Sequence, residues 1–283
     1  MNSGRSIRWA YNFSVWHPTD SQMQLAISCI QEEEKMRIGR FVFRKDAKAS
    51  LIGRLLMRKY VSENSGLPYD KVRFGRDDKG KPYLFGNEPL PALNFNVSHQ
   101  GKFTVLAGEL GRNMKIGIDI MKLEYSGGKS LSEFFRVMNR HFSPLEWSII
   151  RGTNNTTDDE KITMFCRHWC LKESYVKAIG TGITVDLQRI SFRVNTLHLE
   201  IGQVVTDTEL YVNGVHMKDW NFEESLIDKE HCVAVALAEK NMAESSPFHC
   251  LDFNELMKNC KPILLPDPVY SQNFFKKQET PFG

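Results

Sequence analysis

The 283-residue sequence lacks a hydrophobic run long enough to cross a membrane. Its apolar stretches, such as residues 232–238, fall far short of the roughly 20 residues that a membrane-spanning helix needs. The first eight residues contain neither an apolar signal region nor a myristoylation pattern. We therefore expect a soluble protein of the cytosol (cytoplasmic) that has no membrane partner.

Disulfide-type cysteine spacing and a strong net charge are also missing. The six cysteines are scattered without a framework, which is typical of reduced thiols in a reducing compartment. Against 37 Lys and Arg stand 34 Asp and Glu, so the net charge is only +3. This balance disfavours a protein that coats nucleic acid, and we expect no nucleic-acid partner. The hydrophobic fraction of 41% is enough for one large core or two medium ones.

The charge is nevertheless distributed unevenly. Residues 35–81 contain 14 Lys and Arg against five Asp and Glu, a local charge of +9, which leaves −6 for the remainder. An excess of this kind indicates an anionic partner for the first half of the chain. The alternative is that these long side chains only cover the solvated faces of helices.

Hydrophobic periodicity and turn signals predict an α+β fold. The expected helices span residues 46–61, 131–138 and 160–179, with a further helix that begins after the capping sequence Ser143-Pro-Leu-Glu146. The expected strands are a hairpin at 74–83 and segments at 93–97, 103–106, 116–120, 190–194, 209–212, 220–223 and 232–237. Each half thus reads as helices followed by a small antiparallel sheet. We predict an N-terminal lobe over residues 1–113, a similar C-terminal lobe over 114–240, and a tail over 241–283 that is extended on the surface or disordered.

The helix predicted at 160–179 carries the most informative pattern. Phe165, Trp169, Glu173 and Lys177 recur every four residues and form one row. The two aromatic side chains should face the core, which places a carboxylate and an ammonium on the same inward row. The alternative is a solvated Glu–Lys pair worth about 0.3 kcal/mol.

Asp119 lies in the middle of a strand of isoleucines, on the opposite face from them. A carboxylate in this place is unfavourable unless it has a partner. Asp119 and Glu173 together would offer two hard oxygen ligands, which suits Mg²⁺. An ion pair between Asp119 and a lysine explains the position equally well. A zinc site at Cys166, His168 and Cys170 is disfavoured because no second ligand pair follows at zinc spacing, so the two cysteines are predicted to be core residues.

Two loops hold side chains suited to phosphate. Residues 76–81 place Arg76, Lys79 and Lys81 around a glycine turn, where the backbone can approach an anion. The strand ending in Asn96-Val-Ser98-His99 brings a hydroxyl and an imidazole together at its exit. A surface turn and a simple strand-end cap are the structural alternatives for these two loops.

Taken together, these motifs resemble those of the 4′-phosphopantetheinyl transferases. Residues 116–120 (Ile-Gly-Ile-Asp-Ile) and, about 50 residues later, residues 169–177 (Trp-Cys-Leu-Lys-Glu-Ser-Tyr-Val-Lys) are similar to the paired signature (V/I)G(V/I)D and (F/W)xxKE(S/A)xxK of that family. Residues 96–99, residues 76–81 and Arg37 are similar to its coenzyme A contacts. The resemblance covers roughly residues 8–240 and is strongest to the animal members.

The resemblance implies a monomer of two pseudo-symmetric α+β lobes with the site between them. It further implies transfer of the 4′-phosphopantetheine group of coenzyme A to a serine of acyl carrier proteins or domains, such as those of fatty acid synthase and aminoadipate-semialdehyde dehydrogenase, with release of adenosine 3′,5′-bisphosphate. Asp119 and Glu173 would hold Mg²⁺, Glu173 or a water on the metal would accept the serine proton, and Lys177 would stabilise developing charge. The implied coenzyme A contacts are Arg37, Arg76, Lys79, Lys81, Asn96, Ser98, His99 and Lys177.

One position departs from the family pattern. Bacterial members of the surfactin-synthetase type carry a glutamate two residues after the aspartate, where this chain has Met121. A thioether is a poor ligand for Mg²⁺, so the comparison implies that a water takes that ligand position. Two other functions are considered: a non-catalytic homologue that binds coenzyme A or a carrier protein, and a basic adaptor for nucleic acid or phosphorylated partners. The intact Asp119, Glu173 and Lys177 argue against the first.

Overall fold

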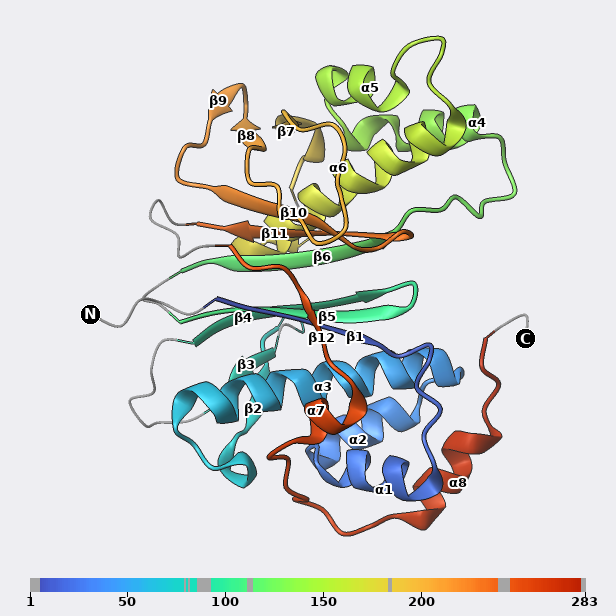
Figure 1. Ribbon diagram of the computed structural model, residues 1–283, viewed down its shortest axis with the longest axis vertical. Helices are drawn as coiled ribbons and strands as arrows, with labels where there is room; N and C mark the ends of the chain where they lie inside the picture. Colours follow the sequence, from blue (N-terminus) through green and yellow to red (C-terminus); the bar gives the residue numbers. More distant parts are fainter. Residues whose placement is uncertain are drawn as a thin grey trace.

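The computed structural model describes residues 6–78, 80, 82–85, 93–110, 114–182, 185–238 and 245–280. Lys79 and Lys81 therefore lie outside the described residues. The described chain is an α+β fold of helices and small, mainly antiparallel sheets (Figure 1). The helices are α1 (Asp20–Ser28), α2 (Glu32–Gly39), α3 (Arg44–Ser65), α4 (Leu131–Val137), α5 (Pro144–Arg151), α6 (Asp158–Ile179), α7 (Phe253–Met257) and α8 (Pro268–Lys276), with short 3₁₀ turns at Tyr69–Lys71, Met138–His141 and Leu187–Arg189. The strands are β1 (Ser6–Asn12), β2 (Phe74–Arg76), β3 (Pro82–Leu84), β4 (Leu93–Gln100), β5 (Phe103–Leu110), β6 (Ile116–Lys122), β7 (Ile190–Arg193), β8 (Glu209–Val212), β9 (Val215–His216), β10 (Asn221–Asp228), β11 (His231–Leu237) and β12 (His249–Cys250).

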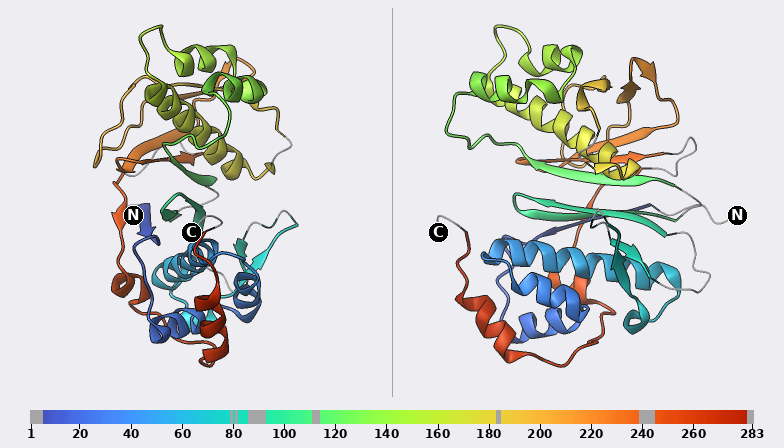
Figure 2. Two further views of the ribbon diagram at one scale, coloured as in Figure 1. Left: turned by 90° about the vertical axis from the view of Figure 1, so that its right-hand side faces the viewer. Right: turned by 180° about the vertical axis from the view of Figure 1, so that it is seen from behind.

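Two sheets lie face to face at the centre of the molecule, between two layers of helices (Figures 1 and 2). The lower sheet has the strand order β12-β1-β5-β4, and the upper sheet has the order β10-β11-β6. Helices α1, α2 and α3 bury the outer face of the lower sheet in one core, and α4, α5 and α6 bury the outer face of the upper sheet in another. A third core fills the space between the sheets and includes Val105, Ile118 and Val235.

The two halves repeat the same order of elements. In the lower half, the 22-residue helix α3 follows β1 and precedes the hairpin β4–β5, and the sheet order is β1-β5-β4. In the upper half, the 22-residue helix α6 follows β6 and precedes the hairpin β10–β11, and the sheet order is β6-β11-β10. The prediction of two similar α+β halves is therefore confirmed.

Local sequence signals explain where the helices begin and end. The capping box predicted at Ser143 is present: the Glu146 carboxylate accepts the backbone N–H of Ser143, and Pro144 is at the first helical position of α5. Helix α6 begins at a similar box at Thr157 and ends at Gly180, whose φ of +67° suits a glycine. Both long helices exceed the predicted bounds at polar ends, residues 44–45 and 62–65 of α3 and residues 158–159 of α6, which carry no periodic apolar signal.

Strand β10 is longer than the predicted segment, since it runs on to Asp228. Periodicity did not predict this extension because Glu224 and Ser225 are polar, although both are buried, as is Glu223 before them. Glu223 pairs with Arg8 of β1, and Glu224 pairs with Arg167 of α6. Burial of these carboxylates depends on partners from distant segments, which periodicity does not show.

Residues 245–280 wrap around the lower half and differ from the extended tail that was expected. They form β12, which pairs in parallel with β1, followed by α7 and α8 (Figure 1). Leu256 and Phe274 are buried in the lower core. The helices have ordinary start signals, a capping box from Asp252 to Glu255 and Pro268 at the first position of α8. Lys277 then donates hydrogen bonds to carbonyls at the end of α2.

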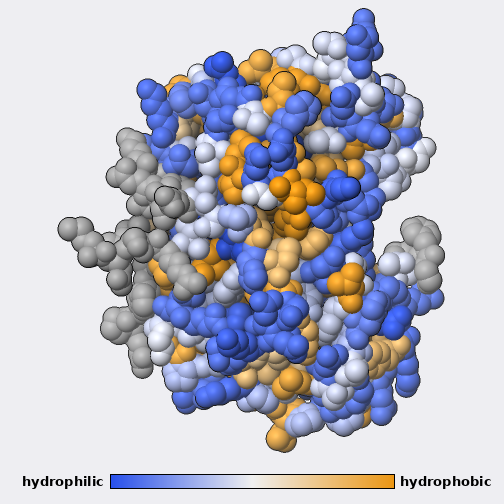
Figure 3. Space-filling model, in the orientation of Figure 1, coloured by the Kyte–Doolittle hydropathy of each residue, from blue (hydrophilic) through white to orange (hydrophobic). Residues whose placement is uncertain are grey.

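The surface differs between the two halves. On the face shown in Figure 3, hydrophobic surface gathers mainly in the upper half, whereas the lower half is largely hydrophilic. The exposed Leu197 and Ile201, between β7 and β8, belong to the upper half. The described basic residues between positions 35 and 76 belong to the lower half. Among the described helices, none has the length and apolarity that crossing a bilayer demands.

Candidate active site

Asp119 and Lys177 form an ion pair at the junction of the two halves. The Nζ atom of Lys177 lies 2.6 Å from Oδ1 of Asp119, whose side chain is largely buried. Ser98 of β4 completes the group, because its hydroxyl donates to Asp119 Oδ1 at 2.8 Å and accepts from Lys177 Nζ at 2.9 Å. Lys177 also donates to the carbonyl of Ile118 at 3.2 Å. Strands β4 and β6 and helix α6 therefore meet at one polar centre.

Gly117 allows helix α6 to lie directly against β6. A Cβ atom at this position would lie 2.0 Å from the Ser174 carbonyl oxygen and 2.5 Å from the Ala178 nitrogen, both of which belong to the helix backbone. Such contacts are impossible for any residue with a side chain. The glycine two residues before Asp119 is thus the reason that Lys177 can reach its carboxylate.

Glu173 precedes Lys177 by one helical turn and lies near Asp119. Burial, followed by the negative charge of Asp119, raises the pKa of the Glu173 carboxyl, and the charge of Lys177 opposes this shift. Lys177 is paired with Asp119 and not with Glu173. The solvated Glu–Lys pair considered from the sequence is therefore wrong.

A cavity of about 590 Å³ opens beside this polar centre, between the two halves of the molecule. Glu173, Lys177 and Trp169 line it from α6, so the row predicted on that helix does face inward. Phe165, earlier in the row, is buried in the upper core and stacks on Trp169 with ring centroids 6.2 Å apart. The lower half contributes Asp77, Gly80, Pro82, Asn96 and Val97.

Side chains of β4 attach the lower sheet to the edge of the upper one. The Asn96 carboxamide oxygen accepts the N–H of Ile118 at 2.9 Å, and Gln100 accepts the N–H of Lys122 in the same way. The Gln100 amide nitrogen also lies 3.1 Å from the sulfur of Met121. Asn96 and Ser98, predicted as coenzyme A contacts, thus hold β4 against β6.

Basic side chains of the predicted coenzyme A site gather on the lower half. Arg37 and Arg76 both bond to the carboxylate of Glu34. Partial desolvation, followed by the charges of Lys177, Arg54 and Arg37, lowers the pKa of the His99 imidazole, although its side chain keeps substantial contact with solvent. His99 is therefore within electrostatic reach of both Lys177 and the arginines.

Sequence reasoning missed a buried pair beneath the cavity. Lys172, next to Glu173 in the motif, points the other way into the upper core, where its ammonium lies 2.9 Å from the Glu146 carboxylate. It also donates hydrogen bonds to the carbonyls of Leu187 and Ile190. Burial lowers the pKa of Lys172 and raises that of Glu146, while their mutual attraction opposes both shifts. The only feature of the sequence that indicated this buried pair was a lysine on the apolar side of the helix.

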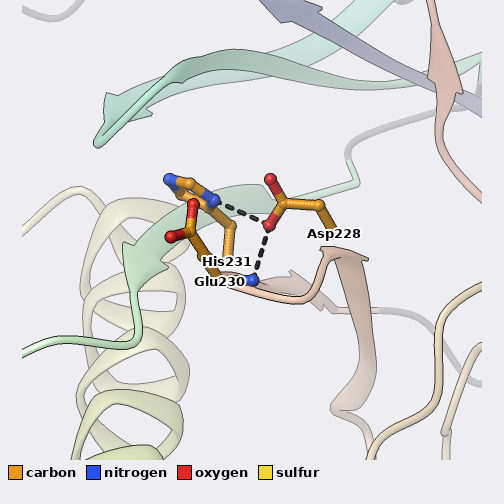
Figure 4. Close-up of side chains that lie close together, drawn as sticks. All are labelled: Asp228, Glu230 and His231. Atoms are coloured by element: carbon orange, nitrogen blue, oxygen red, sulfur yellow. Dashed lines mark hydrogen bonds and ion pairs between the residues drawn. The ribbon is translucent and has the colours of Figure 1, made fainter.

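Asp228, Glu230 and His231 form a second cluster of potential metal ligands (Figure 4). Both nitrogens of the buried His231 ring are already engaged, since Nδ1 donates to Asp228 and Nε2 accepts the N–H of Lys102. Glu230 pairs with the Lys102 ammonium. The cluster therefore joins the hairpin β4–β5 to β11. Gly101 permits this contact because a Cβ there would lie 2.2 Å from His231 Nε2.

The carboxylates of Asp119 and Glu173 fit a divalent cation better. Among the described residues, no hydrogen bond or ion pair engages the Glu173 carboxylate, although it lines the cavity. Burial first, and then repulsion from Asp119, raises the pKa of Glu173, and a cation between the two carboxylates would offset that repulsion. A carboxylate in the wall of a cavity that can admit phosphates, with a second carboxylate beside it, is a typical Mg²⁺ arrangement.

Comparison with known proteins identifies the class. Residues 14–111 match the model of the 4′-phosphopantetheinyl transferase N-terminal region, and residues 115–236 match that of the 4′-phosphopantetheinyl transferase superfamily. The chain belongs to this superfamily, and it is a transferase that moves phosphopantetheine from coenzyme A to carrier proteins. The resemblance seen in the motifs is confirmed.

Individual relatives cover nearly the whole chain. The L-aminoadipate-semialdehyde dehydrogenase-phosphopantetheinyl transferase of Xenopus laevis is 44% identical over 290 residues, which are 98% of this chain and 94% of the relative. The protein of the same name from Homo sapiens is 42% identical over 294 residues, covering 99% and 94%. A 4′-phosphopantetheinyl transferase of Bacillus subtilis is 32% identical over 175 residues, covering 62% and 70%.

Proposed function

We propose that this protein transfers the 4′-phosphopantetheine group of coenzyme A to a serine of acyl carrier proteins or domains and releases adenosine 3′,5′-bisphosphate. The observation that carries the proposal is that Glu173 and Lys177 line a cavity between two halves, one of which is strongly basic, and that Asp119 pairs with Lys177 beside this cavity. The names of the animal relatives support an aminoadipate-semialdehyde dehydrogenase as one target, and fatty acid synthase carrier domains are the second target that we propose.

Asp119 and Glu173 are the proposed ligands of Mg²⁺. The ion, when bound, supplies positive charge that offsets the charge of the coenzyme A pyrophosphate and of the leaving phosphate. Asp119 is already fixed by Ser98 and Lys177, so its carboxylate is oriented in advance. Glu173 is held on the same helix as Lys177, one turn away.

Glu173 is also the proposed general base that accepts the proton of the carrier serine. Its carboxylate lines the cavity without a hydrogen bond or ion pair among the described residues, so its oxygens are accessible to the serine hydroxyl. Lys177 is the proposed stabiliser of charge that develops on the pyrophosphate, since its ammonium lies at the cavity wall. Both residues face the space where the two substrates would meet.

Arg37, Arg76 and His99 are the proposed contacts to the nucleotide and its 3′-phosphate, together with Lys79 and Lys81, which lie outside the described residues. The basic character of residues 35–81 supports this assignment. Asn96 and Ser98 are proposed as neighbours of coenzyme A that also hold β4 in place.

We further propose that the protein works as a cytosolic monomer. Residues 1–113 would form the nucleotide-binding lobe, residues 114–240 the lobe with the metal and catalytic residues, and the tail from 241 would brace the first lobe. The support is that a single chain provides both walls of the cavity. The two matched family regions also meet between residues 111 and 115.

The metal assignment is tested with Asp119→Asn and Glu173→Gln, which keep side-chain size and remove charge. Both variants should lose Mg²⁺-dependent transfer by at least about 100-fold, because each removes a direct ligand. Calorimetry with Mg²⁺ in the presence of coenzyme A should show weakened metal binding. Asp159→Asn, in the exposed first turn of α6, is the control. Unchanged metal affinity in both site variants would contradict the assignment.

A further inference from the structure

Three arginines from different elements surround one buried carboxylate in the lower half. Glu34 of α2 bonds to Arg37 Nε at 2.9 Å through one oxygen. Its other oxygen lies 2.9 Å from Arg76 Nη2 and 3.4 Å from Arg54 Nη1. Ser50, one turn before Arg54 on α3, accepts a bond from Arg37 Nη2 at 2.6 Å. We call these five residues the Glu34 cluster.

The depth of each side chain in the cluster shows how it is built. The Glu34 and Arg54 side chains are only 9% and 13% exposed, whereas those of Arg37 and Arg76 are 36% and 34% exposed. Glu34 therefore binds the arginines on their buried side, and the guanidinium groups of Arg37 and Arg76 remain accessible to solvent. The bonds of Arg37 to described residues use Nε and Nη2, which leaves Nη1 available. Arg54 Nε is buried without a hydrogen-bond partner among the described residues.

The cluster keeps an excess of positive charge. Three guanidiniums and one carboxylate sum to +2, which matches a phosphate monoester that carries about −1.5 to −2 at neutral pH. Burial alone would raise the pKa of Glu34, but Arg54, Arg37 and Arg76 hold it below its ordinary value, so the carboxylate is ionised. Burial, with the repulsion of Arg76 and Arg37, lowers the pKa of Arg54 to about 10, so it is still a cation at neutral pH.

The cluster adjoins the active-site cavity. Arg76 Nη1 donates to the carbonyl of Gly80 at 2.7 Å, and Gly80 lines the cavity. After burial, the charges of Lys177, Arg54 and Arg37 contribute to lowering the pKa of His99. The arginines of the cluster therefore lie next to the cavity that Lys177 lines.

We propose that Glu34 is a positioning residue that holds Arg37, Arg54 and Arg76 in place before a phosphate monoester binds, and so sets the preference for a 3′-phosphorylated nucleotide. This inference rests on the proposed function, because it takes the nucleotide portion of coenzyme A as the ligand. Without the carboxylate, the three cations would repel one another and lose the acceptor that fixes their geometry. Prior ordering reduces the entropy that the arginines lose when the phosphate binds.

The test measures binding of adenosine 3′,5′-bisphosphate and of adenosine 5′-monophosphate by calorimetry. The wild-type protein should prefer the bisphosphate, and Glu34→Gln should reduce that preference at least about fivefold. Transfer assays should show a raised KM for coenzyme A with kcat at saturation unchanged, because the cluster lies away from the reacting atoms. Glu34→Asp keeps the charge and should recover part of the preference.

Glu32→Gln is the matched control, since Glu32 lies on the same helix but is exposed and pairs only loosely with Lys35 at 3.6 Å. It should keep the wild-type preference. An unchanged or increased preference in a folded Glu34→Gln protein would overturn the proposal. If Glu34→Gln does not fold, Glu34→Asp decides, because a wild-type preference in that shortened variant also contradicts the need for this geometry. Failure of the wild-type protein to bind either nucleotide would instead contradict the proposed function.

Discussion

Asp119 is the residue that connects the elements at the polar centre, because its carboxylate accepts hydrogen bonds from Ser98 of β4 and Lys177 of α6. Strand alternation predicted that its carboxylate faces away from Ile118 and Ile120, and the structure confirms this. The choice of Lys177 as its partner depends on how closely α6 approaches β6, which is a tertiary property. The burial of Glu34 could not be predicted for a related reason. Glu34 is one of three consecutive glutamates, and the sequence does not show which of them faces the interior.

Met121 provides a prediction at this scale. Met121→Ala should retain substantial transfer at saturating Mg²⁺, because a thioether is not a ligand that Mg²⁺ requires. Its melting temperature should fall by a few degrees, since the side chain packs against the upper core and contacts Gln100. Met121→Leu keeps the apolar volume and serves as the control. Loss of transfer in a well-folded Met121→Ala protein would show that the sulfur is needed.

Helix α6 shows what can be predicted for an element and what cannot. The end of this helix at Gly180 and the row of residues that faces inward could be predicted, whereas the capping box at Thr157 was not. The sequence did not show that it supplies two opposed sets of polar groups. Lys177 points to the cavity, whereas Lys172 and His168 point into the upper core. Buried polar residues on the apolar side weaken the periodic signal, and their partners come from other elements.

The Lys172–Glu146 pair predicts a stability effect. Lys172→Met should lower the free energy of unfolding by about 3 kcal/mol, because it leaves the Glu146 carboxylate buried without its cation. It should also raise KM for coenzyme A, since Lys172 anchors the carbonyl of Leu187, a cavity residue. Chemical denaturation measures the first effect. Lys161→Met removes an exposed pair with Asp158 from the same helix and should cost under about 1 kcal/mol.

We expect the buried His168 to make the free energy of unfolding depend on pH. Burial is the main cause that lowers its pKa to about 4, against an ordinary value of 6.5. Between these two pH values the unfolded chain binds the extra proton, so the free energy of unfolding should rise with pH across this window, by about 3 kcal/mol. His168→Leu should remove this component from denaturation curves at pH 4.5 and 6.5. His198→Leu, at an exposed site, should retain it. Identical pH dependence in wild type and His168→Leu would contradict the assignment.

At the scale of the whole molecule, the two-lobed α+β fold could be predicted because both halves repeat similar local signals. The contacts that join the two halves could not be predicted in this way. The joining depends on a core between the sheets and on polar contacts across it, such as His231 with Lys102 and Arg8 with Glu223. The helices within residues 245–280 were also not predicted, because the prolines of this segment indicated an extended tail wrapped on the surface or a disordered one.

Substitution of Arg8 tests how strongly polar contacts join the two halves. Arg8 lies in β1, is buried, and pairs with Glu109 of its own sheet at 2.5 Å and with Glu223 of the other sheet at 2.6 Å. Arg8→Met should lower the free energy of unfolding by about 3 to 5 kcal/mol, since two buried carboxylates lose their cation. Arg193→Met, at an exposed and loose pair with Glu209, should change it by under about 1 kcal/mol. Equal effects of the two substitutions in guanidinium denaturation would contradict this account.

The most direct test of the central claim is the intact mass of a carrier domain incubated with this protein, coenzyme A and Mg²⁺. We predict an added phosphopantetheine group, located on one serine by fragmentation. With Lys177→Ala, the rate of this mass increase should fall at least about 100-fold even at saturating coenzyme A, whereas Lys161→Ala should match the wild type. A carrier domain of unchanged mass after incubation with the wild-type protein would contradict the account, and so would wild-type rates with a folded Lys177→Ala protein.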